Sequence, residues 1–273
     1  MRQSNTFTDF DISDEVIVVT GSGGKLGSSY CELFLSLGAR VVGLDVRQSS
    51  SHAYFVDEYS ERYLFCQANV TNKQEVIASA EKIHRKFSKT TVLINNAAID
   101  SPPGASVSEN GPFESYPESS WDSVMAVNLK GVMLASQIFG DVMATNGGGS
   151  IINISSIYGM LSPDQSLYEY RRKNGDEFFK PVAYSVSKAG ILNLTRYLAV
   201  YWAKKNVRVN TLTLAGVADN QDVEFLQGYN NRIPIGRMAE PRDYFGAIVF
   251  LASGASRYMT GSNLVVDGGW TAI

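Results

Sequence analysis

Seven short runs of apolar residues recur along the chain, and most of them are rich in valine, isoleucine and leucine. Within each run the apolar residues are nearly continuous rather than alternating with polar ones. This pattern is typical of strands that are buried on both faces of a parallel sheet. We predict strands at residues 15–20, 41–45, 63–67, 91–95, 150–155, 207–212 and 263–267.

Stretches with a helical spacing of apolar residues separate these runs. We predict helices from the end of a glycine-rich turn to Leu37 and at residues 72–87, 119–145, 181–205 and 241–252. Strands that alternate with helices indicate an α/β protein with a doubly wound, mostly parallel sheet and helices on both faces. No repeat or linker divides residues 15–273, so we predict one domain there. Residues 1–14 form a polar extension, in which Phe7 and Phe10 are the residues able to find a groove.

The composition narrows the possible partners of this domain. A chain of 273 residues with 44% hydrophobic residues can bury a large core, and a net charge of -3 argues against a nucleic-acid or anionic-membrane surface. We find no apolar run near the roughly 18 residues needed to cross a bilayer. The polar and acidic N-terminal residues do not resemble a signal peptide.

Cysteine and histidine are scarce. Cys31 and Cys66 are the only cysteines, they form no C-x-x-C pair, and His52 and His84 are the only histidines. A metal site or a disulfide framework is therefore not expected. Two unpaired thiols suit a reducing compartment, so we expect a cytoplasmic protein.

A glycine-rich turn follows the first predicted strand and precedes the first helix. Its spacing is Thr20-Gly21-x-x-Gly24-x-x-Gly27, with Gly23 in addition. Glycines at such a junction allow the backbone to approach a pyrophosphate, and the helix N-terminus offers free N–H groups and a favourable dipole. The alternative is a tight turn without a ligand. The strand–turn–helix context favours dinucleotide binding, as in a Rossmann fold.

An acidic residue at the end of the second strand, about 20 positions after the turn, is expected to bind the ribose hydroxyls of the adenosine. Asp45 occupies that place, 18 residues after Gly27. Its carboxylate would repel a 2′-phosphate, so we predict NAD rather than NADP. Arg47 weakens this preference because an arginine can accommodate the phosphate, and the alternative for Asp45 is an ordinary residue at a strand end.

Tyr184 and Lys188 lie four residues apart at the start of the helix predicted for residues 181–205. Residues at this spacing share a helix face about 5–6 Å apart. A free tyrosine titrates near pH ~10, and a neighbouring ammonium group favours its phenolate. The pair therefore predicts an acid/base tyrosine that is assisted by a lysine, with a solvated surface pair as the alternative.

Several separate motifs, in order, make residues 15–270 resemble the short-chain dehydrogenase/reductase family. They are Thr20–Gly27, Asn69-Val70, Asn95-Asn96-Ala97-Ala98, Asn128, Asn153–Ser156, Tyr184-x-x-x-Lys188, Arg208-Val209-Asn210 and Val266–Gly269. The resemblance implies hydride transfer to or from a nicotinamide cofactor without a metal.

The resemblance also implies roles for single residues. Ser156 would hold the substrate oxygen, Tyr184 would donate or accept its proton, and Lys188 would lower the pKa of the tyrosine and hold the nicotinamide ribose. Asn128 would anchor a water in the proton relay. We choose Ser156 over Ser155 because Gly159 follows it three places on, as in the family. The implied cofactor contacts are Gly21, Gly24, Lys25, Leu26, Gly27, Asp45, Asn69, Val70, Asn95, Asn96, Ala97, Tyr184, Lys188 and Val217.

The chain departs from the family pattern in four places. Lys25 stands where the single-domain branch usually has its second glycine, and it would either reach a phosphate or be a solvated lysine. Ala98 replaces the final glycine of Asn-Asn-Ala-Gly, and Leu214-Ala215 replaces Pro-Gly after the sixth strand. The largest departure is an insertion at about 162–180, between Ser156 and Tyr184.

The insertion mixes charged residues with Tyr168, Tyr170, Phe178 and Phe179. Aromatic rings stack on the faces of sugars while polar groups bind their hydroxyls, so we expect a hydroxylated or phosphorylated substrate. An oligomer contact or a solvated excursion is the alternative.

The insertion and its flanking motifs also resemble the branch of the family associated with flagellin modification and bacterial surface-glycan biosynthesis. We therefore predict an NAD-dependent oxidoreductase that acts on a sugar-like small molecule, as a homodimer or homotetramer by analogy with the family. The alternatives are a general ketone or 3-oxoacyl reductase and a non-catalytic dinucleotide-binding protein.

Overall fold

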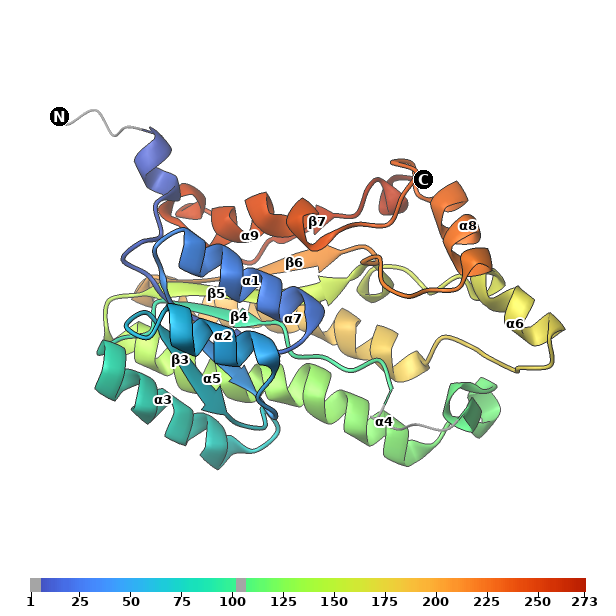
Figure 1. The fold of residues 1–273 in the computed structure, drawn as a ribbon, viewed down its shortest axis with the longest axis horizontal. Helices are drawn as coiled ribbons and strands as arrows, with labels where there is room; N and C mark the ends of the chain where they lie inside the picture. Colours follow the sequence, from blue (N-terminus) through green and yellow to red (C-terminus); the bar gives the residue numbers. More distant parts are fainter. Residues whose placement is uncertain (1–5, 102–106) are drawn as a thin grey trace.

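The computed structural model describes residues 6–101 and 107–273, and its centre is a seven-stranded sheet with the strand order β3-β2-β1-β4-β5-β6-β7 (Figure 1). Every strand pairs in parallel with its neighbours. The strands are β1 (Val16–Thr20), β2 (Arg40–Asp45), β3 (Tyr63–Gln67), β4 (Val92–Asn95), β5 (Gly149–Ser156), β6 (Val207–Leu214) and β7 (Asn263–Val266). The central strands are buried on both faces, which explains their continuous apolar sequences.

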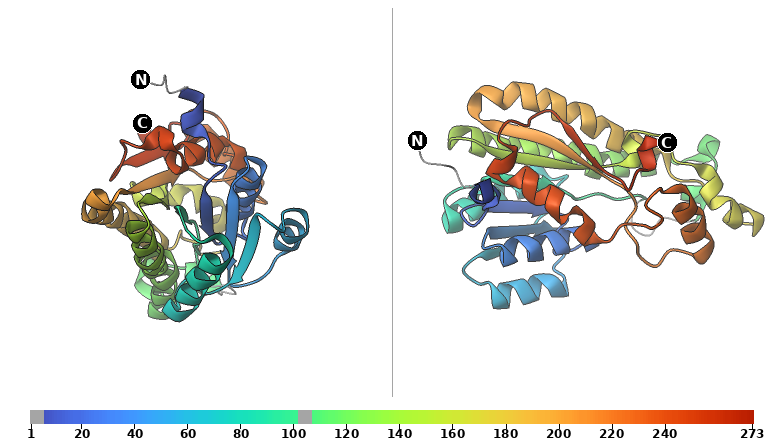
Figure 2. Two further views of the ribbon diagram at one scale, coloured as in Figure 1. Left: turned by 90° about the vertical axis from the view of Figure 1, so that its left-hand side faces the viewer. Right: turned by 90° about the horizontal axis from the view of Figure 1, so that it is seen from above.

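Helices cover both faces of the sheet (Figure 2). On one face, α1 and α9 pack with the strands in one apolar cluster, to which α2 contributes Phe55. On the other face, α3, α5 and α7 form a second cluster. The helices are α1 (Lys25–Ser36), α2 (Ser50–Glu58), α3 (Lys73–Phe87), α4 (Glu118–Met125), α5 (Val132–Thr145), α6 (Glu169–Lys173), α7 (Val182–Trp202), α8 (Val223–Arg232) and α9 (Phe245–Ala252).

The predicted fold class is confirmed, and all seven predicted strands are present with ends within two residues of the prediction. Three helices were missed, α2, α6 and α8. The helix predicted at residues 119–145 is not regular, because a π-helical turn at Ala126–Gly131 separates α4 from α5. Such turns within α-helices are frequent at functional sites, and this one contains Asn128.

Part of the predicted N-terminal extension packs on the domain. A 3₁₀-helix spans Thr6–Phe10, the ring of Phe10 lies 6.4 Å from that of Phe250, and Ile12 is buried. Arg257 Nη2 bonds Asp9 Oδ2 at 3.0 Å. The expected placement of Phe7 and of residues 1–5 falls outside the side chains that the structure describes.

One helical stretch qualifies the expectation that no segment is apolar enough to span a membrane. The continuous helix Glu118–Thr145 passes that test by length and composition, with half of its apolar window buried inside the molecule. Its α5 part packs against the sheet in the cluster that α5 forms with α3 and α7. A core helix passes the same test, so the match is weak support for a membrane span.

Candidate active site

A groove of about 940 Å³ crosses the carboxyl ends of β1, β2 and β4. From β1, the strands β2 and β3 are added on one side of the sheet and β4 to β7 on the other. The strand order therefore reverses at β1, and ligands of open α/β sheets bind at such a point. The groove brings together most of the predicted cofactor residues: Gly21, Gly24, Lys25, Leu26, Gly27, Asp45, Asn69, Val70, Asn96, Ala97 and Val217.

The glycine turn leaves no space for side chains at its first and last glycines. Gly21 has a φ of +65°, and a Cβ atom there would lie 2.7 Å from Ala97 Cα. A Cβ atom on Gly27 would lie 2.1 Å from the carbonyl oxygen of Gly21. The turn therefore closes tightly on the first turn of α1, whose residues line the groove. The first N–H groups of a helix have no intrahelical partner, so an anion would be favoured there.

Asp45 ends β2 at the rim of this groove. Its Oδ2 accepts a hydrogen bond from Gly23 N at 2.9 Å, and its Oδ1 accepts one from Arg47 N at 3.3 Å. The carboxylate thus faces the groove from a fixed position. Arg47 also lines the groove, so both residues weighed for the choice between NAD and NADP are at the site.

His52 contacts the glycine turn through Ser22. The sequence analysis did not assign it to the site. Its ring is buried, it lies 4.3 Å from the ring of Phe65, and its Nε2 is 2.9 Å from Ser22 Oγ. Ser49 N donates to Nδ1 at 3.0 Å, so the proton of the neutral ring belongs on Nε2. Burial lowers the pKa of His52, which favours that neutral form.

Asn95 is a predicted cofactor residue that the structure does not bring to the groove. Its side chain is buried in the sheet, where Nδ2 donates to Asn153 Oδ1 at 2.8 Å and to Ser136 Oγ at 3.0 Å. We therefore correct its assignment from cofactor contact to support beneath the groove. Asn96 holds the turn itself, because its Nδ2 donates to Thr20 O and Gly21 O.

Lys25 makes a contact that the sequence analysis did not foresee, and its expected contact with a phosphate stays a prediction. Its Nζ donates to the carbonyl oxygen of Ala218 and pairs with Asp219 Oδ1 at 2.9 Å. The lysine thus connects the start of α1 with the loop after β6, across the cofactor groove. Both side chains of this ion pair are largely exposed, so the contact contributes little to stability.

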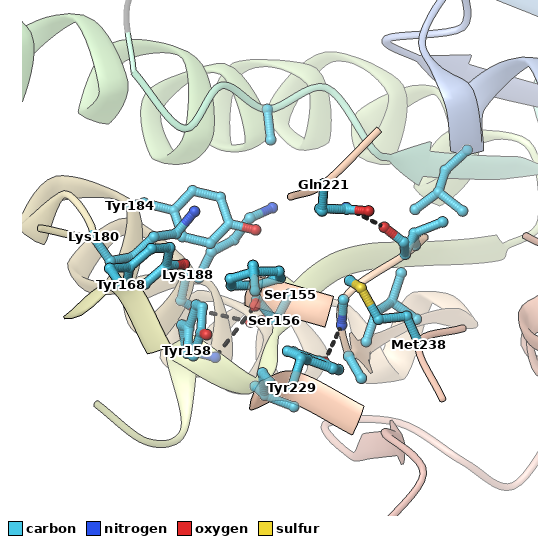
Figure 3. A pocket seen from close by; sticks show the side chains of 18 of the residues that line it. Ser155, Ser156, Tyr158, Tyr168, Lys180, Tyr184, Lys188, Gln221, Tyr229 and Met238 are labelled. Carbon is cyan, nitrogen blue, oxygen red and sulfur yellow. Dashed lines mark hydrogen bonds between the residues drawn. The ribbon is translucent and has the colours of Figure 1, made fainter. Parts of the chain in front are cut away.

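A second cavity of about 490 Å³ adjoins the groove and is lined by three of the four predicted catalytic residues (Figure 3). Ser156 at the end of β5 and both Tyr184 and Lys188 on α7 line it. The two cavities share five residues, namely Leu26, Asn96, Ala98, Val217 and Gln221. One continuous space therefore runs from Asp45 to Tyr184.

Tyr184 and Lys188 share a helix face as predicted, with Lys188 Nζ 5.8 Å from the centre of the Tyr184 ring. The pKa prediction needs correction. Burial and then the charge of Asp100 raise the pKa of Tyr184 to about 12, against a weaker lowering by its hydrogen bond with Ser156. Burial also lowers the pKa of Lys188 to about 8, and its Nζ donates to Ile154 O at 2.8 Å. In this state the phenol is protonated at neutral pH and fit to act as an acid.

The two neighbouring serines have different partners. Ser155 Oγ donates to the carbonyl oxygen of Lys188 at 2.9 Å and so fastens β5 to α7. Ser156 Oγ accepts from Tyr158 N at 3.2 Å and is the hydrogen-bond partner of the Tyr184 phenol. This placement supports the choice of Ser156 as the residue that meets a substrate oxygen.

Asn128 is fully buried in the π-helical turn. Its amide exchanges two hydrogen bonds of 2.8 Å with the backbone of Ile99, and its Nδ2 also donates to Ser187 Oγ at 3.1 Å. It therefore ties the chain after β4 to α7. Both polar groups of the Asn128 side chain thus have protein partners. The water-anchoring role of Asn128 stays a prediction.

The insertion and α8 together form what we call the outer wall, defined as residues 162–180 and 223–232. The rings of Tyr168 and Phe225 are 5.4 Å apart, and Tyr170 Oη donates to Asp222 Oδ2 at 2.5 Å. Arg232 pairs with Asp164. The sequence analysis singled out Tyr168, Tyr170 and Phe178, and all three line the catalytic cavity. The wall contributes four further lining residues that the sequence analysis did not assign: Arg171, Lys180, Phe225 and Tyr229.

Most residues of the site fit a dinucleotide. The first turn of α1 leaves backbone N–H groups for a pyrophosphate beside the glycine turn, Asp45 stands where ribose hydroxyls would lie, and the groove leads to Tyr184. Among residues 6–101 and 107–273, no group of three or more potential ligands is placed to hold a metal ion. Fold and site thus define an NAD(P)-binding oxidoreductase.

The comparisons with known proteins give the family. A family model described as enoyl-(acyl carrier protein) reductase matches residues 24–271. A crystal structure of a short chain dehydrogenase from Leptospira borgpetersenii with bound NAD+ has a TM-score of 0.84 and 36% identity, over 99% of this chain and 97% of that one. The chain belongs to the short-chain dehydrogenase/reductase family.

Relatives with named activities also match this chain over nearly its whole length. The NAD-dependent glycerol dehydrogenase of Listeria innocua is 33% identical over 96% of each chain. The D-threitol dehydrogenase of Mycolicibacterium smegmatis is 30% identical over 96% of this chain and 95% of that protein. The post-translational flagellin modification protein A of Campylobacter coli is 30% identical over 95% of this chain and 99% of that protein.

Proposed function

We propose that this short-chain dehydrogenase/reductase uses NAD(H) to interconvert a secondary alcohol and a carbonyl on a polyol-like or sugar-like small molecule. The observation that carries the proposal is the continuous space from Asp45 to Tyr184, with Ser156 and Lys188 beside the tyrosine. When bound, NAD(H) supplies the hydride acceptor or donor. The residues of the chain orient the substrate and move its proton.

In the proposed mechanism, Ser156 holds the substrate oxygen next to the Tyr184 hydroxyl. For reduction, the protonated phenol donates its proton to that oxygen, which suits its raised pKa. For oxidation, the phenolate must accept the proton, and the Lys188 ammonium stabilises it in that state. The buried positions of Ser156 and Lys188 limit the access of water to the exchange.

Asp45 favours NAD over NADP because its carboxylate stands fixed at the rim of the groove. The NAD-dependent glycerol dehydrogenase and the NAD+-bound Leptospira structure support the same choice. Arg47 is the residue that opposes it.

A polar substrate is favoured by the lining of the catalytic cavity. Tyrosine hydroxyls, Arg171, Lys180, Asn220, Gln221 and Asp222 surround it, together with aromatic rings. Aromatic faces and hydrogen-bonding groups in one cavity suit a molecule with several hydroxyls. The glycerol and threitol dehydrogenases support this class.

A role in flagellin or surface-glycan modification is a narrower form of the same proposal. The Campylobacter coli protein supports it. Dehydrogenases of simple polyols are at least as similar, so we extend the proposal only to the class of polyols and sugars. We also propose a cytoplasmic location, which the two free, buried cysteines support. By analogy with the family, we propose a homodimer or homotetramer.

Replacement of Tyr184 by phenylalanine tests the proposal. The change removes the hydroxyl and keeps the ring, so we expect turnover of the best polyol substrate to fall by orders of magnitude while NADH affinity stays within about twofold. Tyr197→Phe is the matched control, because Tyr197 lies on the same helix with 65% of its surface exposed. Turnover that survives Tyr184→Phe would refute the mechanism.

A screen of polyols, sugars and nucleotide-sugars, followed by NADH absorbance, identifies the substrate for that test. An intact chain that binds NADH tightly and oxidises or reduces none of these compounds would favour a non-catalytic dinucleotide-binding protein. Preferential turnover of a 3-oxoacyl compound would favour the acyl reductase instead.

A further inference from the structure

Lys180, the last residue of the insertion, lies beside the catalytic tyrosine. Its Nζ is 5.2 Å from the centre of the Tyr184 ring, closer than the Nζ of Lys188 at 5.8 Å (Figure 3). It lines the catalytic cavity, and its side chain is only 17% exposed. Tyr184 therefore has two lysines against its ring, and only one of them belongs to the Tyr-x-x-x-Lys motif.

Asp100 is the ionic partner of Lys180. Its Oδ2 lies 2.7 Å from Lys180 Nζ, while its Oδ1 is inaccessible and has no hydrogen-bond partner among the described residues. Asp100 follows β4, directly after Ile99, which is held by Asn128. An anion and a cation from two different segments thus meet at one tyrosine.

The backbone of Lys180 is held firmly. Lys180 N donates to Gln165 Oε1 at 2.9 Å, and Gln165 Nε2 donates to Lys180 O at 3.3 Å. Arg172 closes the insertion further, because its guanidinium donates to the carbonyl oxygens of Gln165 and Phe178. The insertion therefore fixes the start of the Lys180 side chain at the entrance of α7.

We propose that the Lys180–Asp100 ion pair acts through Tyr184 as a positioning pair that sets how readily the phenol gives up its proton. This inference rests on the proposed function in one respect, the use of Tyr184 as acid and base. It goes beyond it by giving the insertion a part in the chemistry, in addition to forming a wall of the cavity.

The two members of the pair act in opposite directions on Tyr184. The negative charge of Asp100 raises the pKa of the phenol. The ammonium of Lys180 offsets this charge at close range. The other groups beside Tyr184 are Lys188 from the same helix, Tyr158 from the segment after β5 and Ser156 at the end of β5, and substitutions in the pair leave these three residues in place.

Single substitutions separate this role from a structural one. Lys180→Met leaves Asp100 unpaired, so we expect the titration of Tyr184 to move about one pH unit towards alkaline values. Asp100→Asn leaves Lys180 unpaired and should move it about one unit the other way. The double variant should return close to the wild type, and Lys180→Arg, which keeps the charge, should behave as the wild type.

The readout is the titration of Tyr184 itself, followed by NMR of tyrosines labelled with ¹³C at Cζ, with and without NAD. Tyr184→Phe identifies the resonance. The pH dependence of kcat/KM for alcohol oxidation is the second readout. Lys173→Met is the matched control, because Lys173 lies in the same insertion in an exposed pair with Glu169. Thermal unfolding of each variant checks that it is folded.

Opposite shifts in the two single variants support the inference. Shifts in the same direction, or no shift in either folded variant, would overturn it. A merely structural ion pair is broken equally by Lys180→Met and by Asp100→Asn, so both variants would then change Tyr184 in the same way. Opposite NMR shifts without turnover of any alcohol or carbonyl would uphold the pair and refute the proposed function. The two proposals can therefore fail separately.

Discussion

The two ends of the active-site space are held together by different kinds of contact. At the cofactor end, the backbone of the glycine turn touches Ala97 and its own first residue, and Val16 to Val19 of β1 are fully buried. At the substrate end, the outer wall is fixed by side chains: a group of aromatic rings, the Tyr170–Asp222 hydrogen bond and the Arg232–Asp164 ion pair.

This difference explains how one framework can serve many substrates. At Gly21 and Gly27 the turn tolerates almost no change in sequence, because a side chain there would collide with main-chain atoms. The Tyr170–Asp222 hydrogen bond and the Arg232–Asp164 ion pair join partly exposed side chains and contribute little individually, so these contacts of the outer wall can change without loss of the fold. We therefore expect substitutions at the cofactor end to be severe and those at the outer wall to be mild and specific to substrate.

The largest effect is expected for Gly27→Ala. Its Cβ atom would meet the Gly21 carbonyl oxygen at 2.1 Å, so we expect a loss of about 3 kcal/mol in the free energy of unfolding without cofactor, together with loss of NAD binding. Gly24→Ala is the matched control, because the nearest atom lies 3.5 Å away, and it should cost about 1 kcal/mol or less. Denaturant titration measures both. Equal losses would contradict the steric explanation.

An intermediate effect is expected for Asp45→Asn, which keeps an acceptor for Gly23 N and removes the charge. Hydrogen bonds to charged groups contribute about 1.5–3 kcal/mol, so NAD affinity should fall about 10- to 100-fold and the preference over NADP should shrink. Calorimetric titration with both cofactors measures the change. Asp57→Asn on the exposed side of α2 is the control. A wild-type chain that prefers NADPH would show that Arg47 decides the choice instead.

The smallest effect is expected for Tyr170→Phe. The change removes the hydrogen bond to Asp222 at a partly exposed site, so KM for the substrate should rise about two- to fivefold with little change in NAD affinity. Steady-state kinetics and NADH titration measure the two quantities. Tyr54→Phe, at an exposed position on α2, should change neither. A loss of NAD affinity in Tyr170→Phe would show that the two ends are not separate.

The outer wall also marks the limit of the sequence analysis. The aromatic and charged residues of the insertion indicated a substrate-binding role, yet α8 carried no pattern strong enough to predict it. Its apolar residues Phe225 and Tyr229 pack on Tyr168 and Trp270, which come from distant parts of the chain. A short helix stabilised by such contacts has little local signal, because its partners are brought to it by the fold.

The pKa of Tyr184 shows the same limit in the chemistry. The spacing of Tyr184 and Lys188 on a helix face predicts their proximity, because helix geometry is local. The direction of the pKa shift depends on burial and on Asp100, which lies 84 residues earlier in the chain. Spacing alone therefore predicted a lowered pKa where the folded chain without cofactor has a raised one.

The sequence by itself determined the parallel sheet, the glycine turn with Asp45 at a strand end, and the shared helix face of Tyr184 and Lys188, whereas Ser156 was assigned through the resemblance to the family. The sheet, the turn and the shared face follow from apolar runs, from spacing along one helix and from residues at strand ends, all of which act over short stretches of chain. Only the tertiary structure decided that Asn95 lies beneath the groove, that Lys25 reaches Asp219, and that Lys180 and Asp100 meet at Tyr184. Those contacts join segments far apart in the sequence, so their geometry exists only once the sheet and its helices have packed.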